Sequence, residues 1–322
     1  MLSLFLSFIS CSKYLQHEEK SFVGWMRNTN QIFTGDEYQL RFGIYVSNAR
    51  YVQEHNSKID KTFTLSLNKF AALTPAEYRS MLGLRPSIRN LPQSKSTSTS
   101  TSNFKDDIEY LDWREKGVVN PIKNQQQCGS CWAFSAVQAI ESMNAIQSGK
   151  LERYSEQSLV DCVLTCFGCS GGLVDLAFDY IISREHGKMN LESEYPYVGV
   201  EESCKFNNMQ KVGSISNYKG INSGSEDDLA DKLQKEGPIA VGIDASATSF
   251  TLYSGGIYDE KGCSPSNLDH GVGCVGFGKE GDIKYWIVRN SWGEEWGEKG
   301  YIRMIWKNNQ CGIASMAYYP IY

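Results

Sequence analysis

The sequence predicts an α+β protein in which a helical region precedes a β-rich region. Between Cys131 and Gln147, apolar residues repeat at intervals of three and four, and Gly149 stands where a helix would end, so this segment is expected to be a helix. Further along, four short segments are apolar or alternate apolar with polar residues between glycines, which is typical of strands. These segments are Ile239–Ile243, Gly271–Phe277, Tyr285–Arg289 and Tyr301–Ile305.

The composition is that of a folded globular protein and excludes two classes of partner. Of its 322 residues, 41% are hydrophobic, which is an ordinary share for a protein with a packed core. The formal net charge is −5, and no long basic stretch interrupts the sequence. Because nucleic acids and anionic membranes attract basic surfaces, neither is expected as a partner. We expect a monomer.

The N-terminal third is divided by two changes in composition. Residues 1–12, "MLSLFLSFISCS", form an apolar run too short to span a membrane, and we interpret it as a secretory signal, the alternative being an N-terminus without that role. Residues 94–103, "SKSTSTSTSN", are of low complexity and predict an exposed, easily cut linker. The expected organisation is therefore a first region at 13–106 and a second at 107–322, whose helical half ends near 217 and whose β half starts near 218.

One amphipathic helix is predicted in the first region. Between Glu37 and Asn56, apolar residues recur at helical spacing, and an arginine follows Glu37 by four residues, where it can form an ion pair. The residues expected on the apolar side are Leu40, Ile44, Tyr45 and Val52.

Cysteine usage raises a question about "KNQQQCGSCWAFSA", in which Cys128 and Cys131 are three residues apart. Nine cysteines remain once Cys11 leaves with the signal, so in an oxidising compartment at least one thiol lacks a partner within the chain. A zinc site with Cys166 and Cys169 fits the pair spacing, but the 34 residues between the pairs exceed the usual gap. A thioredoxin-type redox pair would follow a strand, whereas polar residues precede Cys128.

A third interpretation is a nucleophilic cysteine. Cys131 stands at the start of the predicted helix, where the helix dipole should lower its pKa and favour the thiolate. A thiolate nucleophile needs an imidazole, and only His186 and His270 follow the linker. His186 precedes glycine at a charged helix end and is expected to be solvated, whereas His270 opens an apolar strand. Asn290 could orient the imidazole through its amide oxygen.

Four motifs together resemble the papain-like cysteine proteases, in particular the cathepsin L-like subgroup in its proenzyme form. They are "QCGSCWAFS", "CSGG", "LDHGVGCVGFG" and "YWIVRNSWGEEWGEKGY", and the resemblance extends from Asp107 to Tyr322. It implies a papain-like two-domain fold, with a helical left domain, a β-barrel-like right domain and an active-site cleft between them, preceded by a helical propeptide.

The resemblance also implies catalytic roles. Cys131 would be the nucleophile, His270 its acid/base partner and Asn290 the residue that orients the imidazole. Gln125 would donate a hydrogen bond to the oxyanion of the tetrahedral intermediate. Gln126 stands where the family usually has glycine. No cofactor and no metal are expected.

The same resemblance implies three disulfides, Cys128 with Cys169, Cys162 with Cys204, and Cys263 with Cys311. Cys131 would then be free. Cys166 and Cys274 are left over; Cys274 is expected to be a buried small apolar residue, and the sequence gives no role for Cys166.

Upstream, the spacing of Glu37, Arg41, Ile44, Tyr45, Asn48, Val52 and Asn56 resembles the long inhibitory propeptides of this family. Tyr45 and Val52 replace the commoner phenylalanine and isoleucine. A second propeptide motif is matched by Asn68 and Phe70, but Ser66 and Ala72 stand where glycine and aspartate are usual, so activation by acid is expected to differ here.

Substrate-binding positions are carried over in the same way. Gly171, Gly172 and the backbone of Asp269 would lie along the substrate main chain, and Trp292 would flank the leaving group. The pocket for the second residue on the acyl side would be formed by Leu173, Val174, Gly242, Leu268, Gly271 and Met316. Because all six are apolar or glycine, leucine, valine or phenylalanine should be preferred there over arginine.

The expected function is that of a cysteine endopeptidase made as a zymogen, acting through a thioester acyl-enzyme in a secreted or lysosome-like compartment. Its expected partners are protein and peptide substrates and its own propeptide as an intramolecular inhibitor. The enzymatic alternative is an exopeptidase. An alternative from a different class is a catalytically silent binding protein that keeps the fold, or a zinc-dependent structural module.

Overall fold

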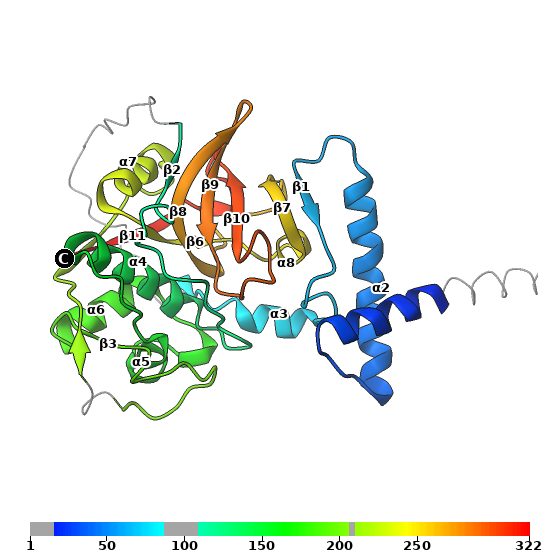
Figure 1. Cartoon of the computed structure of the whole chain (residues 1–322), viewed down its shortest axis with the longest axis horizontal. Helices are drawn as coiled ribbons and strands as arrows, with labels where there is room; N and C mark the ends of the chain where they lie inside the picture. The colour runs from blue at the N-terminus through cyan, green and yellow to red at the C-terminus, as the bar shows by residue number, and fades with distance from the viewer. Residues whose placement is uncertain (1–15, 87–108, 206–209) are drawn as a thin grey trace, which may run out of the picture.

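The computed structural model describes residues 16–86, 109–205 and 210–322. The predicted signal at 1–12, the Ser/Thr-rich stretch at 94–103 and the expected junction near 106–107 lie outside these residues. Figure 1 shows three parts side by side: a group of helices that includes α4, α5 and α6, a central sheet, and an N-terminal segment on the far side of that sheet. We use "N-terminal segment" for residues 16–86.

The helical half is organised around α4, which begins at Cys131 and ends at Ser148, so the helix predicted from periodicity is confirmed. Gly149 follows in the left-handed conformation with φ 73°, which glycine adopts without steric cost. Its first fifteen side chains are all buried because α5, α6 and the sheet surround it. The elements of this half are β2 Leu111–Asp112, α4 Cys131–Ser148, α5 Glu156–Cys162, η2 Gly168–Ser170, α6 Val174–Arg184, β3 Met189–Asn190 and β4 Lys211–Val212.

The β half contains all four predicted strands. The strand expected at 271–277 is longer than predicted, since it runs from His270 to Glu280, and His270 is its first residue. The elements of this half are β5 Asn217–Gly220, α7 Glu226–Glu236, β6 Ile239–Ile243, α8 Thr248–Thr251, β7 Tyr253–Tyr258, β8 His270–Glu280, β9 Ile283–Arg289, β10 Tyr301–Ile305, η4 Gln310–Gly312 and β11 Met316–Ile321.

With β1 at Phe63–Leu65, the strands join in the order β1-β7-β10-β9-β8-β6-β11-β5, and β2 pairs with β8. Most neighbours are antiparallel, while β10 and β7 are parallel. The strand β2 belongs to the helical half in sequence but pairs with β8 of this sheet. This pairing joins the two halves near the start of the second region.

Two hydrophobic cores correspond to the two halves. One contains Cys131, Trp132 and the inner faces of α4, α5 and α6. The other contains Trp292 and Trp296 of the β half, together with aromatic side chains of the N-terminal segment. Since Cys131 belongs to the first core and Trp292 to the second, the predicted catalytic residues meet where the two halves face each other.

The N-terminal segment consists of a helix over residues 16–28, α2 Gly35–Ser57, β1 Phe63–Leu65 and α3 Pro75–Met81. The strand β1 pairs antiparallel with β7, which extends the central sheet by one strand from this segment. In Figure 1, α3 leads from α2 toward the boundary between the two halves. None of the helices in the described residues is both long and apolar enough to cross a membrane.

The helix predicted between Glu37 and Asn56 is confirmed as α2, but the prediction that Leu40 lies on its apolar side is wrong. Leu40 is 55% exposed, whereas its neighbour Arg41 is buried. Arg41 turns inward because its guanidinium pairs with Glu77 of α3 and donates a hydrogen bond to the carbonyl oxygen of Ala72 at 3.0 Å. Periodicity alone cannot show that a buried ion pair replaces an apolar contact.

The polar residues of α2 hold the chain that follows it. Asn48 donates to the carbonyl oxygen of Ala71 at 2.8 Å, and the Asn56 amide makes two hydrogen bonds to the backbone of Leu65. Backbone groups that would otherwise be buried without partners are thereby satisfied. The spaced pattern of α2 is thus a set of anchors for residues 65–72.

The described part of the chain contains three disulfides: Cys128–Cys169, Cys162–Cys204 and Cys263–Cys311. They are the pairs that the family resemblance implies. The first joins one thiol from each of the two pairs that a zinc site would need, so that arrangement is not formed. Cys131, Cys166 and Cys274 are free and buried.

Candidate active site

Cys131 is the first residue of α4, and its thiol lies against backbone groups of two other segments. Its Sγ accepts hydrogen bonds from the N–H of Gly271 at 3.3 Å and from the N–H of Gly83 at 3.2 Å. Burial raises the pKa of this thiol to about 11, although both hydrogen bonds act in the opposite direction. In this covered state the pKa of Cys131 is therefore raised rather than lowered, because burial outweighs the two hydrogen bonds.

His270 and Asn290 form a buried pair beside the thiol. Nε2 of His270 lies 2.8 Å from Oδ1 of Asn290, which also accepts the N–H of Ser291 at 2.8 Å. Because Oδ1 is an acceptor, the proton sits on Nε2, and Nδ1 is the ring nitrogen without a hydrogen-bond partner among the described residues. Burial lowers the pKa of His270 to about 4.

The backbone brings the thiol and the imidazole together. The N–H of Gly271 contacts Sγ of Cys131, and His270 directly precedes Gly271 in β8. The backbone of β8 therefore places the imidazole next to the thiol. The ring of Trp292 lies 4.8 Å from the imidazole and excludes water from it. His186, by contrast, is exposed just beyond the end of α6, away from any such pair.

Gln125 supplies a hydrogen-bond donor near Cys131. Its Nε2 donates to the carbonyl oxygens of Met81 and Cys128, both at 2.8 Å. Its Oε1 accepts the hydroxyl of Ser291 at 2.7 Å, which fixes the direction of the amide. The next residue, Gln126, has φ 57°, a left-handed conformation that explains why glycine is favoured at this position.

Residues 81–85 of the N-terminal segment, here termed the cleft segment, lie along these side chains. The N–H of Leu84 donates to the carbonyl oxygen of Asp269 at 2.9 Å, and the N–H of Arg85 donates to that of Gly172 at 3.1 Å. Gly172 in turn donates its N–H to the carbonyl oxygen of Gly83 at 2.9 Å. Gly172 and Asp269, both predicted to hold a substrate main chain, therefore bind a peptide backbone.

Gly83 is required where the cleft segment crosses the thiol. A Cβ on this residue would lie 1.7 Å from the carbonyl oxygen of Gly129, a distance that no side chain could tolerate. Gly171 is similarly confined, since its Cβ would lie 2.6 Å from the carbonyl oxygen of Gly83. The close approach of the cleft segment to the second region therefore requires glycine in both, at Gly83 and at Gly171.

An apolar pocket receives the side chain of Leu84, which is 1% exposed. A Cβ on Gly242 would lie 2.7 Å from a methyl carbon of Leu84, and the same point is 3.3 Å from Leu268 and 3.5 Å from Met316. Leu173 and Val174 belong to the same apolar cluster. Gly271 lies on the thiol side, where a Cβ would lie 3.1 Å from the carbonyl oxygen of Cys131.

The opposite side of the thiol is covered by two aromatic side chains of the N-terminal segment. Phe70 and Tyr78 pack edge-on against Trp292, with ring centroids 5.4 Å and 5.9 Å from it. The hydroxyl of Tyr78 donates to the carbonyl oxygen of Ala245. The N-terminal segment therefore occupies the site on both sides of Cys131.

Sequence reasoning found the residues of the second region but missed the cleft segment and Tyr78. The available signal was "MLGLRP", an apolar run containing a glycine and closed by a proline, located between a helix and a low-complexity stretch. Such a run has no helical or strand periodicity, so its contacts could not be read from pattern.

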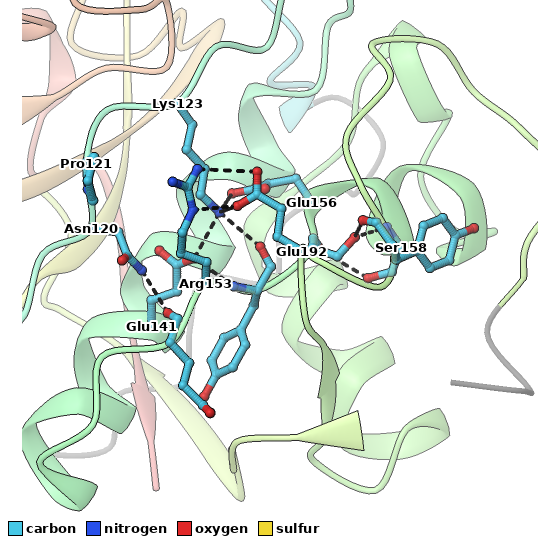
Figure 2. Close-up of polar contacts among 12 residues, drawn as sticks. Asn120, Pro121, Lys123, Glu141, Arg153, Glu156, Ser158 and Glu192 are labelled. Atoms are coloured by element: carbon cyan, nitrogen blue, oxygen red, sulfur yellow. Dashed lines mark hydrogen bonds and ion pairs between the residues drawn. The ribbon is translucent and has the colours of Figure 1, made fainter. Parts of the chain in front are cut away.

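A buried charged cluster supports the chain that leads to Gln125. Figure 2 shows Lys123 surrounded by acidic side chains; its Nζ lies 2.9 Å from Glu141 of α4 and 2.7 Å from Glu156 of α5, and it also contacts Glu192. Burial raises the pKa of Glu156 to about 7, against the attraction of Lys123. These contacts fix residue 123 only two positions before Gln125.

Among the described residues, no three His, Cys, Asp or Glu side chains are placed to hold a metal ion. A thiol, an imidazole held by an amide and a side-chain amide donor, gathered between a helical and a β-rich half and covered by a preceding segment, define the class: a cysteine protease in precursor form.

Comparison with known proteins gives the family. Residues 108–321 match the papain family of cysteine proteases, and residues 22–78 match the cathepsin propeptide inhibitor domain. The chain belongs to the papain family of cysteine proteases and is made with an inhibitory propeptide.

Named relatives agree over nearly the full length. Cysteine proteinase 3 of Dictyostelium discoideum is 42% identical, with 100% of this chain and 97% of the relative covered, and cathepsin L2 of Homo sapiens is 39% identical, with 96% and 94% covered. The structure of procathepsin L 3 from the larval midgut of Tenebrio molitor matches with a TM-score of 0.82 at 35% identity, covering 95% of this chain and 99% of that one. The proform of the ragweed pollen protease Amb a 11 matches with a TM-score of 0.86 at 35% identity, covering 95% and 94%.

Proposed function

We propose that the protein is a cysteine endopeptidase in which Cys131 is the nucleophile, His270 the acid/base, Asn290 the residue that orients the imidazole, and Gln125 an oxyanion donor. The observation that carries this proposal is the position of the cleft segment. The carbonyl oxygen of Met81 accepts a hydrogen bond from Nε2 of Gln125, while Gly83 contacts the thiol of Cys131. A peptide backbone thus already lies against the groups that a substrate would use.

In the proposed reaction, the thiol proton of Cys131 passes to Nδ1 of His270 as Sγ attacks the carbonyl carbon of the scissile bond. The negative charge that develops on the carbonyl oxygen is stabilised by Nε2 of Gln125 and the backbone N–H of Cys131. His270 gives a proton to the leaving amine as the C–N bond breaks, which leaves a thioester on Cys131. His270 then takes a proton from water as the water oxygen attacks the thioester, and it returns that proton to Sγ as the C–S bond breaks, which releases the acid and restores the thiol.

The environment of Leu84 supports the proposed preference for an apolar residue at the second position on the acyl side. Leu84 is buried against Gly242, Leu268 and Met316, a set without charged or hydrogen-bonding side chains. An arginine in this pocket would lose its hydration without gaining a partner. Leucine, valine or phenylalanine should therefore be cleaved in preference.

Endopeptidase rather than exopeptidase action is favoured by the way the N-terminal segment crosses the site. Tyr78 lies against Trp292 on one side of the thiol, and Leu84 fills the apolar pocket on the other. The chain therefore enters and leaves the site without a barrier. A substrate that continues in both directions should fit in the same space.

We also propose the boundaries of maturation. The propeptide would comprise residues 13–106 after removal of a signal at 1–12, and cleavage between roughly Ser94 and Asp107 would release a mature domain at 107–322. The mature enzyme would be a monomer in a secreted or lysosome-like compartment. Cathepsin L-like and digestive proteinases among its relatives support this location.

The proposal is tested by covalent labelling of the mature enzyme. A peptide with leucine at the second position and a thiol-reactive group in place of the scissile bond should add once per molecule, with the adduct on Cys131. Cys166→Ala should label equally, because that thiol is buried and its pKa is raised to about 12 by burial. An adduct on any other residue, or none on a fully processed enzyme, would refute the assignment.

A further inference from the structure

A small polar cavity lies between α4 and the strands β8 and β9, next to the His270–Asn290 pair. The cavity has a volume of about 10 Å³, which is enough for about one water molecule. Every side chain that lines it is buried. Its lining residues are Lys123, Phe134, Ser135, Gln138, Gly271, Val272, Gly273, Arg289, Asn290 and Ser291.

Four polar atoms on this lining have no hydrogen-bond partner among the described residues. They are Nε2 and Oε1 of Gln138, Nε of Arg289 and Nδ2 of Asn290. Gln138 is 3% exposed and packs directly on β8, where a Cβ on Gly273 would lie 2.3 Å from its amide. Buried polar atoms are costly when they are unpaired, so several of them on one cavity of this size indicate a bound molecule that pairs them.

The chemistry of the four atoms selects the ligand. Arg289 Nε and Asn290 Nδ2 are both donors, and donors cannot satisfy each other. A water molecule can accept from both and donate one of its own protons to Oε1 of Gln138, so it pairs three of the four atoms and leaves Nε2 of Gln138 without a partner. The charged groups that line the cavity are Arg289, whose Nη2 donates to the carbonyl oxygen of Pro121 at 2.7 Å, and Lys123, which is held by Glu141 and Glu156.

We propose that this cavity binds one ordered water that joins Gln138, Arg289 and Asn290, and that Gln138 thereby acts as a positioning residue for the Asn290 amide. The inference rests on the proposed roles of His270 and Asn290. Without an acceptor, the Arg289 and Asn290 donors would be left unpaired on the same cavity, and the Asn290 amide would be held only through Oδ1, by His270 and the N–H of Ser291. The water oxygen removes this deficit, since it accepts from Asn290 Nδ2 and keeps Oδ1 on the imidazole.

The consequence concerns the protonated imidazole. In the reaction, His270 must carry a proton for the leaving amine, and Oδ1 of Asn290 stabilises that charged form through the 2.8 Å contact. Loss of the water should destabilise the imidazolium and move the alkaline limb of the activity profile to lower pH. Binding of substrate in the apolar pocket should be unaffected.

The test compares the mature parent enzyme with Gln138→Met, which keeps the side-chain volume but removes both polar atoms, and with Gln138→Glu, which restores an acceptor. Gln138→Met should lower kcat by about three- to tenfold with little change in KM, and should shift the alkaline limb by about 0.5–1 pH unit. Gln138→Glu should recover most of the loss. Gln234→Met is the matched control, because Nε2 of Gln234 is also buried without a partner but does not line the cavity.

An unchanged pH profile in Gln138→Met, or an equal loss in Gln234→Met, would overturn the proposal. If Gln138→Met does not fold, a crystal structure of the parent decides: a water within hydrogen-bond distance of Gln138, Arg289 and Asn290 supports it, and a dry cavity refutes it. An inactive, fully processed parent would instead contradict the proposed function.

Discussion

Gly242→Ala should change the substrate preference of the mature enzyme in a direction set by the pocket. The new methyl group would point into the pocket that Leu84 fills in the proenzyme. It would lie 2.7 Å from a methyl carbon of Leu84 and 3.3 Å from Leu268. Gly242 lies within β6 and its φ is not positive, so alanine is compatible with its backbone. The substitution therefore reduces the depth of the pocket without straining the strand.

The magnitude follows from the crowding. Overpacking a filled site costs about 1–3 kcal/mol, whereas a shorter side chain avoids most of that cost. A difference of about 2 kcal/mol between phenylalanine and valine corresponds to a change of about 30-fold in their relative kcat/KM. The assay measures kcat/KM for peptides that differ only at the second position on the acyl side.

Gly220→Ala provides the control, since this glycine lies in β5, outside the pocket, with its nearest side-chain neighbour at 3.3 Å. Its ratio of phenylalanine to valine cleavage should equal that of the parent. If Gly242→Ala leaves the ratio unchanged, or if arginine is the preferred residue in the parent, the pocket has been assigned to the wrong place.

Three further predictions concern the proenzyme. First, Cys131 should react with iodoacetamide far more slowly in the proenzyme than in the mature enzyme at pH 7, because burial holds its pKa near 11; equal rates, with the modified residue mapped by mass spectrometry, would contradict this. Second, the hydrogen bonds from Arg41 lower the pKa of Glu77 to about 2, below its ordinary 4.5, so their contribution to stability is complete above about pH 4.5 and is lost progressively as the pH falls from there through about 2. Glu77→Gln should therefore destabilise the propeptide by about 1–2 kcal/mol, after allowance for the exposure of Glu77, and speed activation at pH 6, while parent-like kinetics would exclude this role. Third, Gln126→Gly should raise the stability of the mature enzyme by about 1 kcal/mol in a denaturant titration, since φ 57° is strained for glutamine; a loss of stability would show that side-chain contacts of Gln126 matter more.

The sequence predicted those features of the site that depend on local secondary structure. Cys131 at a helix start and His270 at a strand start could be placed because periodicity defines both elements. The spacing of the cysteines alone left a zinc site open, and only the disulfide between Cys128 and Cys169 excludes the four-thiol arrangement.

What could not be predicted depends on contacts between distant segments. Arg41 is buried because Glu77 and the carbonyl oxygen of Ala72 lie opposite it, and this overrides the exposure that its charge suggests. The pKa of Cys131 is raised rather than lowered because the cleft segment covers it. Neither effect leaves a periodic signal, since both depend on how the N-terminal segment packs on the second region.

The same packing accounts for inhibition in physical terms. The cleft segment occupies the backbone-binding groups of Gly172 and Asp269, and burial holds both Cys131 and His270 in their neutral forms. Removal of the propeptide should readmit water to both side chains, which favours the charged pair that nucleophilic attack requires.

The central claim is that Cys131 performs the chemistry of a propeptide-inhibited endopeptidase. The most direct measurement incubates the purified proenzyme at mildly acidic pH with reductant, then follows cleavage of a peptide with leucine at the second position, with Cys131→Ala and Cys274→Ala alongside. The account predicts activity in the parent and in Cys274→Ala, whose thiol lies fully buried in β8, and none in Cys131→Ala. Activity in Cys131→Ala, or none in a parent whose propeptide has been removed, would contradict it.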